Sequence, residues 1–483
     1  MSIVFVLQSL GVLLGLQCIL VLWRPSGSWA RAHELTSLAG LSIALLVSAL
    51  SYRGPEAAFF GGLLFSNSLF RLVICGSLLV ALVVNRMLAF THRLPPNRKP
   101  ECFLFLTMIC IWAFVLWFST GVLSTYFCLV GLGITGLFAV GLAFSDRSEG
   151  EALLKYWYQL VIAALVILIS LLAVAIFAGD FSFRALSAAF VGASQIRVAV
   201  IFLLLVLPYL LIGGIFPFHF NIVDRDHGSP WAVQAMNTLM ISGAIYGGLI
   251  KIGMELFGGA HAPIFALRFF VCLGFVGTFW GLLGALTQEN TKRKLALFSV
   301  GAFSFPFMVL GAPSATAISA AVFRLVFSSL ALAALYWVLG WYHERLRNDD
   351  GSVLAGLGRH RLGAGLLLTV GICYFLSVPL IAGFSTVFSL FGAAFHAGSL
   401  VVLLGIFAVS LLAALIMLRL LALVFFERAR GPAPPVDESS LLCNFLDRLI
   451  GASIFMALLV GGIGWSGVWG GLMKASAAFI QLY

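Results

Sequence analysis

Long apolar runs recur along the whole chain, and they constrain its fold more than any other feature. A helix needs roughly 20 apolar residues to cross the hydrocarbon core of a bilayer. About fourteen runs approach or exceed that length, at 3–23, 35–51, 58–85, 102–119, 121–144, 156–178, 199–219, 230–250, 264–286, 295–311, 314–341, 363–391, 397–426 and 449–470. The runs do not alternate with a period of two, which excludes a transmembrane barrel. The sequence therefore predicts an all-α polytopic membrane protein of about 14 transmembrane helices.

Charged residues make up only 10% of the 483 residues, and their distribution predicts the orientation of the chain. Most of the 28 Lys and Arg residues lie in loops that follow odd-numbered predicted helices. The positive-inside rule places those loops in the cytoplasm and both termini on the non-cytoplasmic side. The net charge of +10 thus indicates contact with the lipid bilayer rather than with nucleic acid. The first run lacks a basic start and a cleavage site, so we expect it to stay as the first helix.

The sequence contains no motif for cofactor or metal chemistry. Its 8 cysteines are dispersed, with no pair at the two-residue separation that metal and redox sites favour. A glycine-rich phosphate loop and a nucleophile elbow are also missing from the sequence. We therefore expect no catalytic, cofactor-binding or metal-binding residue in this chain, and any redox chemistry belongs to another subunit.

Two of the predicted helices carry helix-breaking residues near their middle. The seventh contains Pro208, Gly213, Gly214 and Pro217, and the twelfth contains Pro379 and Gly383, which should cost helical hydrogen bonds near mid-membrane. Each is the fourth helix of a group of five, helices 4–8 and helices 9–13. Matching broken helices line the ion path of inverted-repeat transporters. The alternative is that the prolines only kink the helices.

This pattern divides the chain into four predicted parts. The N-terminal transmembrane helices 1–3 occupy 1–101, and the two inverted five-helix repeats occupy 102–258 and 259–427. A cytoplasmic loop and the last transmembrane helix occupy 428–483.

Several stretches of the sequence carry a family resemblance. "FPFHFNIVDRDHGSPWAVQAM" places Pro-Phe-His before a loop and Ser-Pro at the start of the next helix, and "TQENTKRKLALFSVG", "FRLVFSSLALAALYWVLG" and "VPLIAGFSTVF" follow. Together they resemble the antiporter-like membrane subunits of respiratory complex I, Mrp antiporters and membrane-bound hydrogenases. Two further stretches, "FFGGLLFSNSLFRLVICGSLLVALVV" and "ALLKYWYQLVIAALVILISLLA", look most like subunit N of bacterial complex I.

The resemblance implies a role in proton translocation or in its structural coupling. It implies a non-catalytic membrane subunit of a complex I type NADH:quinone oxidoreductase in the bacterial cytoplasmic (inner) membrane. The implied partners are other membrane subunits and a soluble arm that carries flavin and iron–sulfur clusters. Two alternatives stay open: the membrane subunit of an inorganic-carbon uptake complex or cation antiporter, and a group 4 type hydrogenase, whose nickel–iron would lie on a partner.

The sequence departs from the resembled family at its titratable positions. Relatives carry a glutamate in the fifth helix, lysines in the seventh, eighth and twelfth, and often His and Lys in the eleventh. This chain has at those places Gly133, Ile212, Ile241 or Ser242, Val387, and Ser328 with Leu332. Since a proton relay needs groups whose pKa can be tuned near neutrality, we predict that the central hydrophilic axis is mostly closed.

The remaining candidates for an ion path or a structural pin are polar residues in or near the predicted helices: His219, Asp224, Asp226, His227, Lys251, Glu255, Arg324, Ser328 and His396. We expect His219 to be a structural ring bonded to a carbonyl freed by the break, and Asp224 to lie in a solvated cytoplasmic loop. Arg324 lies near the bilayer centre, where an arginine is costly. No Asp or Glu falls within the predicted runs, so we expect Arg324 to face the twelfth helix as a pin, with carbonyls, Ser328, water or an anion as partners.

Overall fold

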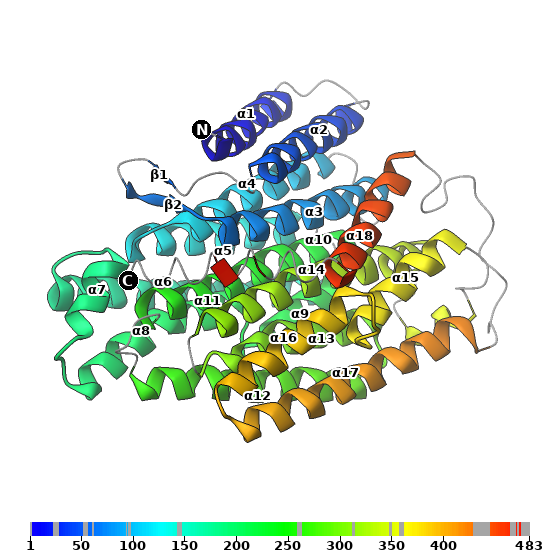
Figure 1. Ribbon diagram of the computed structural model, residues 1–483. Helices are drawn as coiled ribbons and strands as arrows, with labels where there is room; N and C mark the ends of the chain where they lie inside the picture. The colour runs from blue at the N-terminus through cyan, green and yellow to red at the C-terminus, as the bar shows by residue number, and fades with distance from the viewer. Residues whose placement is uncertain are drawn as a thin grey trace.

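The structure is a computed structural model that describes residues 2–22, 29–51, 57–59, 62–92, 94, 98–142, 147–257, 263–311, 314–346, 350–356, 362–427, 445–463, 470 and 473–474. Its long helices run side by side in one bundle, with α1 and α2 along one edge and α12 and α17 along the opposite edge (Figure 1). The hairpin and the short helix α7 lie at one end of the bundle.

The first half of the chain contains the following elements: α1 (Ser2–Leu22), α2 (Trp29–Leu50), β1 (Ala57–Phe59), β2 (Leu64–Ser66), α3 (Ser68–Phe90), α4 (Lys99–Phe118), α5 (Val122–Leu142), α6 (Arg147–Ala178), α7 (Phe183–Phe190), α8 (Gln195–Gly213), α9 (Phe220–Gly228), α10 (Trp231–Ala235), η2 (Met236–Ser242) and α11 (Gly243–Phe257). The second half contains α12 (Ile264–Thr287), α13 (Thr291–Ser304), η3 (Phe305–Val309), α14 (Ala315–Leu346), η4 (Gly351–Leu354), α15 (Leu362–Phe375), α16 (Ala382–His396), α17 (Leu400–Phe425) and α18 (Phe445–Ile463).

Twelve helices within the described residues are long and apolar enough to cross a membrane, which confirms the predicted all-α polytopic fold. The two other predicted runs are also helical. The tenth corresponds to α13 with η3, and the twelfth to the shorter apolar helices α15 and α16. The inverted relation between the two five-helix groups and the four-part division of the chain stay predictions. The predicted cytoplasmic loop after 427 lies almost wholly outside the described residues.

Both predicted breaks are present, but they differ in form. The helix α8 continues through Pro208 and ends at Gly213, and the next residue, Gly214, has a left-handed φ of 60°. A Cβ atom on Gly213 would lie 2.7 Å from Ile245, near the middle of the span Trp231–Leu256, so the break after α8 lies near the middle of that span. The second break separates α15 from α16, which are 14 and 15 residues long and too short to cross singly.

The predicted third helix starts later than its apolar run. The strands β1 (Ala57–Phe59) and β2 (Leu64–Ser66) pair antiparallel, with Ala57 opposite Ser66. The helix α3 begins only after Asn67, whose side chain accepts a hydrogen bond from the Phe70 backbone N–H and caps the helix. Hydropathy alone does not register this cap, because the hairpin is as apolar as the helix that follows it.

A buried ion-pair cluster joins the N-terminal helices to the last one. Arg86 of α3 contacts the carboxylate of Glu34 in α2, and its Nε donates to Asp447 Oδ1 of α18 at 2.6 Å. These carboxylates, like Glu255 and Glu344, lie in helices that cross the bundle. The predicted apolar runs contain no Asp or Glu, but the helices extend beyond the runs and include these carboxylates.

Two spans form the centre of the bundle and carry the main candidate residues. The span Trp231–Leu256 and the span Ala315–Leu346 are each 94% buried within the described structure. By contrast, α1 and the apolar part of α6 are only 22% and 28% buried. Lys251 and Arg324 are thus held on the two most enclosed helices.

Candidate functional site

Gly133 and Ile212, which the sequence predicts at the family's fifth-helix glutamate and seventh-helix lysine, lie against each other. A Cβ atom on Gly133 of α5 would lie 3.1 Å from Ile212 Cγ2 of α8 and 2.5 Å from Leu160 Cδ2 of α6. Ile212 is buried, at 2% exposure, and Leu160 at 9%. No carboxylate fits at Gly133 unless Leu160 moves, so the centre of the first half is sealed by aliphatic side chains. We call these three residues the aliphatic seal.

Polar side chains around the aliphatic seal bind backbone carbonyls. Tyr156 donates its hydroxyl to the Gly133 carbonyl at 3.2 Å, and Gln159 Nε2 donates to the Leu211 carbonyl at 2.7 Å. Asn237 Nδ2 donates to the Val233 carbonyl at 3.1 Å. These three hydrogen bonds all end on the main chain around the seal, and none of them joins one side chain to another as a proton relay requires.

The eighth predicted helix contains a π-helical stretch, η2, that the sequence did not indicate. It includes Ile241 and Ser242, which are both buried; the sequence predicts one or the other at the place of the family's eighth-helix lysine. A Cβ on Gly136 would lie 2.7 Å from Ile241 Cδ1 and from Asn237 Oδ1, so η2 packs directly on α5. Such π-helical turns occur frequently at functional sites, yet here the side chains that point to α5 include an aliphatic one.

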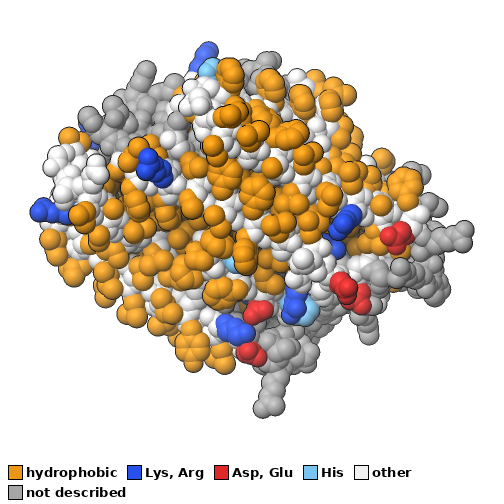
Figure 2. Space-filling view, turned by 90° about the horizontal axis from the view of Figure 1, so that it is seen from below, with side chains coloured by type: hydrophobic (Ala, Val, Ile, Leu, Met, Phe, Trp, Pro, Cys, Tyr) orange, Lys and Arg blue, Asp and Glu red, His pale blue; other side chains and the backbone are white. Residues whose placement is uncertain are grey.

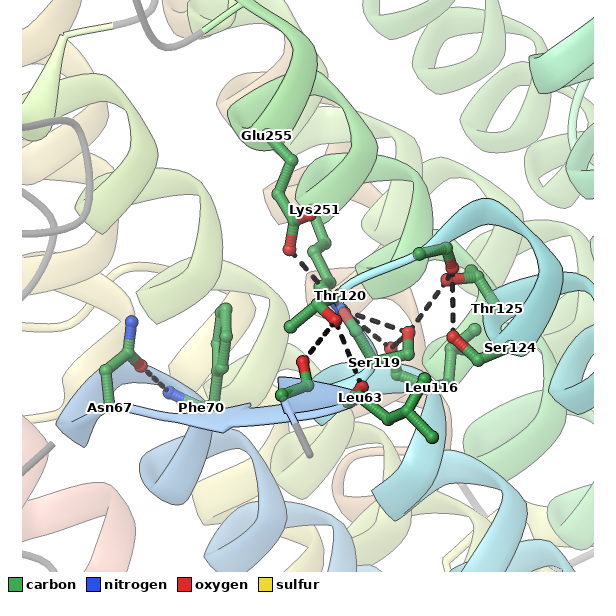
Figure 3. A network of polar contacts seen from close by, with 12 residues as sticks. Leu63, Asn67, Phe70, Leu116, Ser119, Thr120, Ser124, Thr125, Lys251 and Glu255 are labelled. Carbon is green, nitrogen blue, oxygen red and sulfur yellow. Dashed lines mark hydrogen bonds and ion pairs between the residues drawn. The ribbon is translucent and has the colours of Figure 1, made fainter. Parts of the chain in front are cut away.

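The cation of the first half is Lys251, which lies beside the end of α4 (Figure 3). Its ammonium donates to the Leu116 carbonyl at 3.1 Å, to Ser119 Oγ at 3.2 Å and to the Ser119 carbonyl. Its Nζ also lies 3.5 Å from Glu255 Oε1, one turn further along α11. Lys251 and Glu255 with the end of α4 form what we call the Lys251 cluster.

The Lys251 cluster is closed to solvent. Lys251 is 1% exposed and Glu255 is 2% exposed, and the rings of Phe70 and Phe183 lie 5.6 Å and 6.0 Å from the ammonium. The carbonyls that Lys251 binds are at the carboxyl end of α4, where the helix dipole is negative. Lys251 therefore joins α4, α7 and α11, and its charge is balanced by Glu255.

The cation of the second half is Arg324 of α14, which is 2% exposed. Its Nη1 donates to Thr386 Oγ1 of α16 at 3.0 Å, and its guanidinium lies 5.0 Å from the Phe305 ring and 4.9 Å from the Tyr374 ring. Phe375 lies 5.8 Å away. These five residues form what we call the Arg324 cage, and it encloses the break between α15 and α16.

Hydroxyl groups extend the Arg324 cage. Ser328, one turn beyond Arg324, lies 3.1 Å from the Tyr374 hydroxyl, and that hydroxyl also donates to the Arg324 carbonyl at 3.3 Å. Thr386 donates to the Gly383 carbonyl at 2.9 Å. Within the described residues no carboxylate forms an ion pair with Arg324. The structure thus places Arg324 against both halves of the broken helix, where the sequence predicted it, without a bound counter-charge from an acidic side chain.

Three candidates lie away from both clusters. His219 lies between α8 and α9, half-buried, and stacks on Phe216 at a centroid distance of 5.6 Å. Burial lowers the pKa of His219, while a hydrogen bond with the Pro217 backbone acts in the opposite direction. His396 ends α16 and is exposed.

Asp224 lies in the short helix α9, which connects the spans Gln195–Gly213 and Trp231–Leu256, rather than in an irregular loop. Asp224 Oδ2 lies 3.2 Å from Lys155 Nζ of α6, and both side chains are about half exposed. Among the predicted residues, the structure brings together Arg324 with Ser328 and Lys251 with Glu255. It adds Ser119, Thr386 and Tyr374, of which the last two flank the helix-breaking Pro379 and could have been chosen on that ground.

Comparison with protein families gives a match over most of the candidate site. The model of the family described as NADH:quinone oxidoreductase/Mrp antiporter, TM, matches residues 119–413. This range contains the aliphatic seal, Lys251 and Arg324. The match agrees with the resemblance that the sequence motifs indicated.

Individual relatives are more distant. NAD(P)H-quinone oxidoreductase chain 4 2 of Thermosynechococcus vestitus is 26% identical over 302 residues, which cover 61% of this chain and 55% of the relative. NADH-quinone oxidoreductase subunit N of Mycobacterium bovis is 27% identical over 249 residues, 50% of this chain and 46% of the relative. The chain thus matches about half the length of these relatives. The Mrp complex from Dietzia sp. contains a chain of similar fold, with a TM-score of 0.84, 15% identity, and coverage of 98% and 97%.

Proposed function

The chain belongs to the NADH:quinone oxidoreductase/Mrp antiporter family, and from this premise we propose that it is an antiporter-like subunit of a complex I type NADH:quinone oxidoreductase. In this role it supplies membrane architecture and lateral coupling between neighbouring subunits. It does not conduct protons along the family's glutamate and lysine positions.

The aliphatic seal carries this proposal. Gly133, Ile212 and Leu160 fill the place where relatives have a carboxylate and an ammonium, and aliphatic side chains offer no group that binds a proton. Among the buried cations of the described residues, Lys251 is paired with Glu255, and Arg324 is an arginine, which stays protonated at physiological pH. Both hold helices together, and this fits coupling better than relay.

Proton flux tests the proposal directly. We expect the purified chain in liposomes to show no more proton flux under an imposed potential than empty liposomes do. The triple variant Leu160→Ala/Gly133→Glu/Ile212→Lys makes room at the seal and restores a titratable pair there, so it is expected to raise the flux. Proton flux through the unaltered chain above that of empty liposomes would overturn the proposal.

Co-purification tests which complex contains the chain. We propose a bacterial inner-membrane location, both termini on the non-cytoplasmic side, and partners that include other membrane subunits and a soluble arm. Subunits with flavin and iron–sulfur clusters are expected to come out with the chain in mild detergent. A soluble zinc protein would instead indicate an inorganic-carbon uptake complex, and a nickel–iron subunit a hydrogenase.

A further inference from the structure

An open groove lies on the membrane-facing side of the second half, between α12, η3, α16 and α17. Its volume is about 560 Å³, within the range of roughly 300–1,000 Å³ typical of small-molecule sites. One face of α12 lines it with residues spaced three and four apart: Ile264, Leu267, Arg268, Val271, Cys272 and Phe275. Figure 2 shows this side of the molecule as a broad apolar surface, with charged side chains mainly toward its edges.

Arg268 is the charged residue of the groove. It lies four residues into α12, about 6 Å from the start of the helix, and it is exposed. Within the described residues no acidic side chain pairs with it. The expected topology places this end of α12 on the non-cytoplasmic side, where basic residues are disfavoured. An arginine at the end of a membrane-facing apolar groove is stabilised by an anionic group, and lipid headgroups in the bilayer supply such groups.

The start of α17 lies at the same end of the groove. Ser399 lines the groove and caps α17 by accepting a hydrogen bond from the Val402 backbone N–H at 3.4 Å. The amino end of this 26-residue helix is the positive end of its dipole. It adds to the positive potential that Arg268 produces, while Val271, Phe275 and Met308 make the rest of the groove apolar.

We propose that this groove binds a phospholipid with a net negative headgroup. Its phosphate pairs with Arg268, and one acyl chain lies along the apolar stripe of α12. The match between a single cation at one end and an apolar channel beyond it favours a lipid over a transmembrane helix of a neighbouring subunit, which offers no phosphate to the arginine. This inference does not depend on whether the chain conducts protons.

Cys272 provides a reporter inside the groove, because its thiol is exposed there. The test uses the full chain in detergent with the other accessible or undescribed cysteines replaced by alanine, at positions 18, 75, 373 and 443. The rate of maleimide labelling of Cys272 is measured with added phosphatidylglycerol and with added phosphatidylcholine. We expect phosphatidylglycerol to slow the labelling about tenfold relative to phosphatidylcholine, as for one charge-assisted contact.

The variant Arg268→Gln is expected to remove this difference between the two lipids. Arg184→Gln is the matched control, because Arg184 is also exposed in the non-cytoplasmic connection before α8 but lines none of the described pockets; it should leave the difference unchanged. Equal protection by both lipids, or full protection that survives Arg268→Gln, would overturn the proposal. Protection of Cys272 in the assembled complex that is independent of added lipid would assign the groove to a neighbouring subunit instead.

Discussion

The Lys251 cluster and the Arg324 cage both bury a cation, but different contacts stabilise the two charges. Each holds a cation on a span that is 94% buried, with less than a few per cent of the residue exposed. Lys251 has a carboxylate one turn away and carbonyls at the end of α4. Arg324 has three aromatic rings and a threonine hydroxyl. The first cluster is close to neutral, whereas the second keeps a net positive charge.

This difference predicts how much stability the protein loses when each cation is removed. A buried ion pair that loses one partner leaves an unpaired charge, and the loss is large. A buried arginine without an acidic partner carries its own desolvation cost, so removing it also removes that cost. The two cations should therefore contribute unequally to stability although their burial is the same.

The largest effect is expected for Lys251→Met. The variant leaves Glu255 and the Leu116 and Ser119 carbonyls without their donor, and it should lower the free energy of unfolding by about 3–5 kcal/mol. Chemical unfolding in detergent measures this change. The double variant Lys251→Met/Glu255→Leu should recover part of it. Lys155→Met is the control, because Lys155 pairs with carboxylates at the surface; no change in stability is expected there.

Ile212→Lys comes next in size. The side chain enters the aliphatic seal, where Leu160 and Gly133 offer it no partner, and a central charge costs about 2.5–3.5 kcal/mol on insertion scales. Val387→Lys tests the corresponding position of the second half and should also destabilise the protein. Ile212→Met, which keeps the volume without the charge, is the control. If the free energies of unfolding of Ile212→Lys and Ile212→Met were equal, the aliphatic seal would have room for water around the lysine.

Arg324→Leu should cost about 2 kcal/mol, less than Lys251→Met. The variant loses the hydrogen bond to Thr386 and the ring contacts, but it no longer buries a charge. Arg324→Lys should retain part of the stability, since it keeps the charge but not the planar group. A loss for Arg324→Leu greater than that for Lys251→Met would reverse the comparison and indicate a bound anion beside the guanidinium.

The smallest effect is expected for Thr386→Val. It removes one hydrogen bond to the guanidinium and should cost about 1.5 kcal/mol, with the rings of the cage unchanged. Ser410→Ala is the matched control, because Ser410 binds only the carbonyl of its own helix at Ile406. Equal stability of the two variants would show that the rings alone hold Arg324.

The fold could be predicted from the sequence because the apolar runs are long and the motifs specific. The contact of Gly133 with Ile212 was not predicted, because it depends on how α5 and α8 pack. Glu255 lies outside the predicted apolar run 230–250, but its helix continues to Phe257 and includes it. The hairpin before α3 and the π-helical η2 depend on caps and packing that hydropathy does not record. The first break follows Gly213 rather than Pro208, because α8 continues through the proline.

Leu160 of the aliphatic seal comes from α6, a helix at the periphery of the bundle. Only 28% of the apolar part of α6 is buried within the described structure, yet this helix supplies the side chain that packs against Gly133. A peripheral helix accumulates substitutions with little effect on the core. The three residues of the aliphatic seal lie on α5, α6 and α8, outside the two most enclosed spans, so substitutions among them leave the sequence of those spans unchanged.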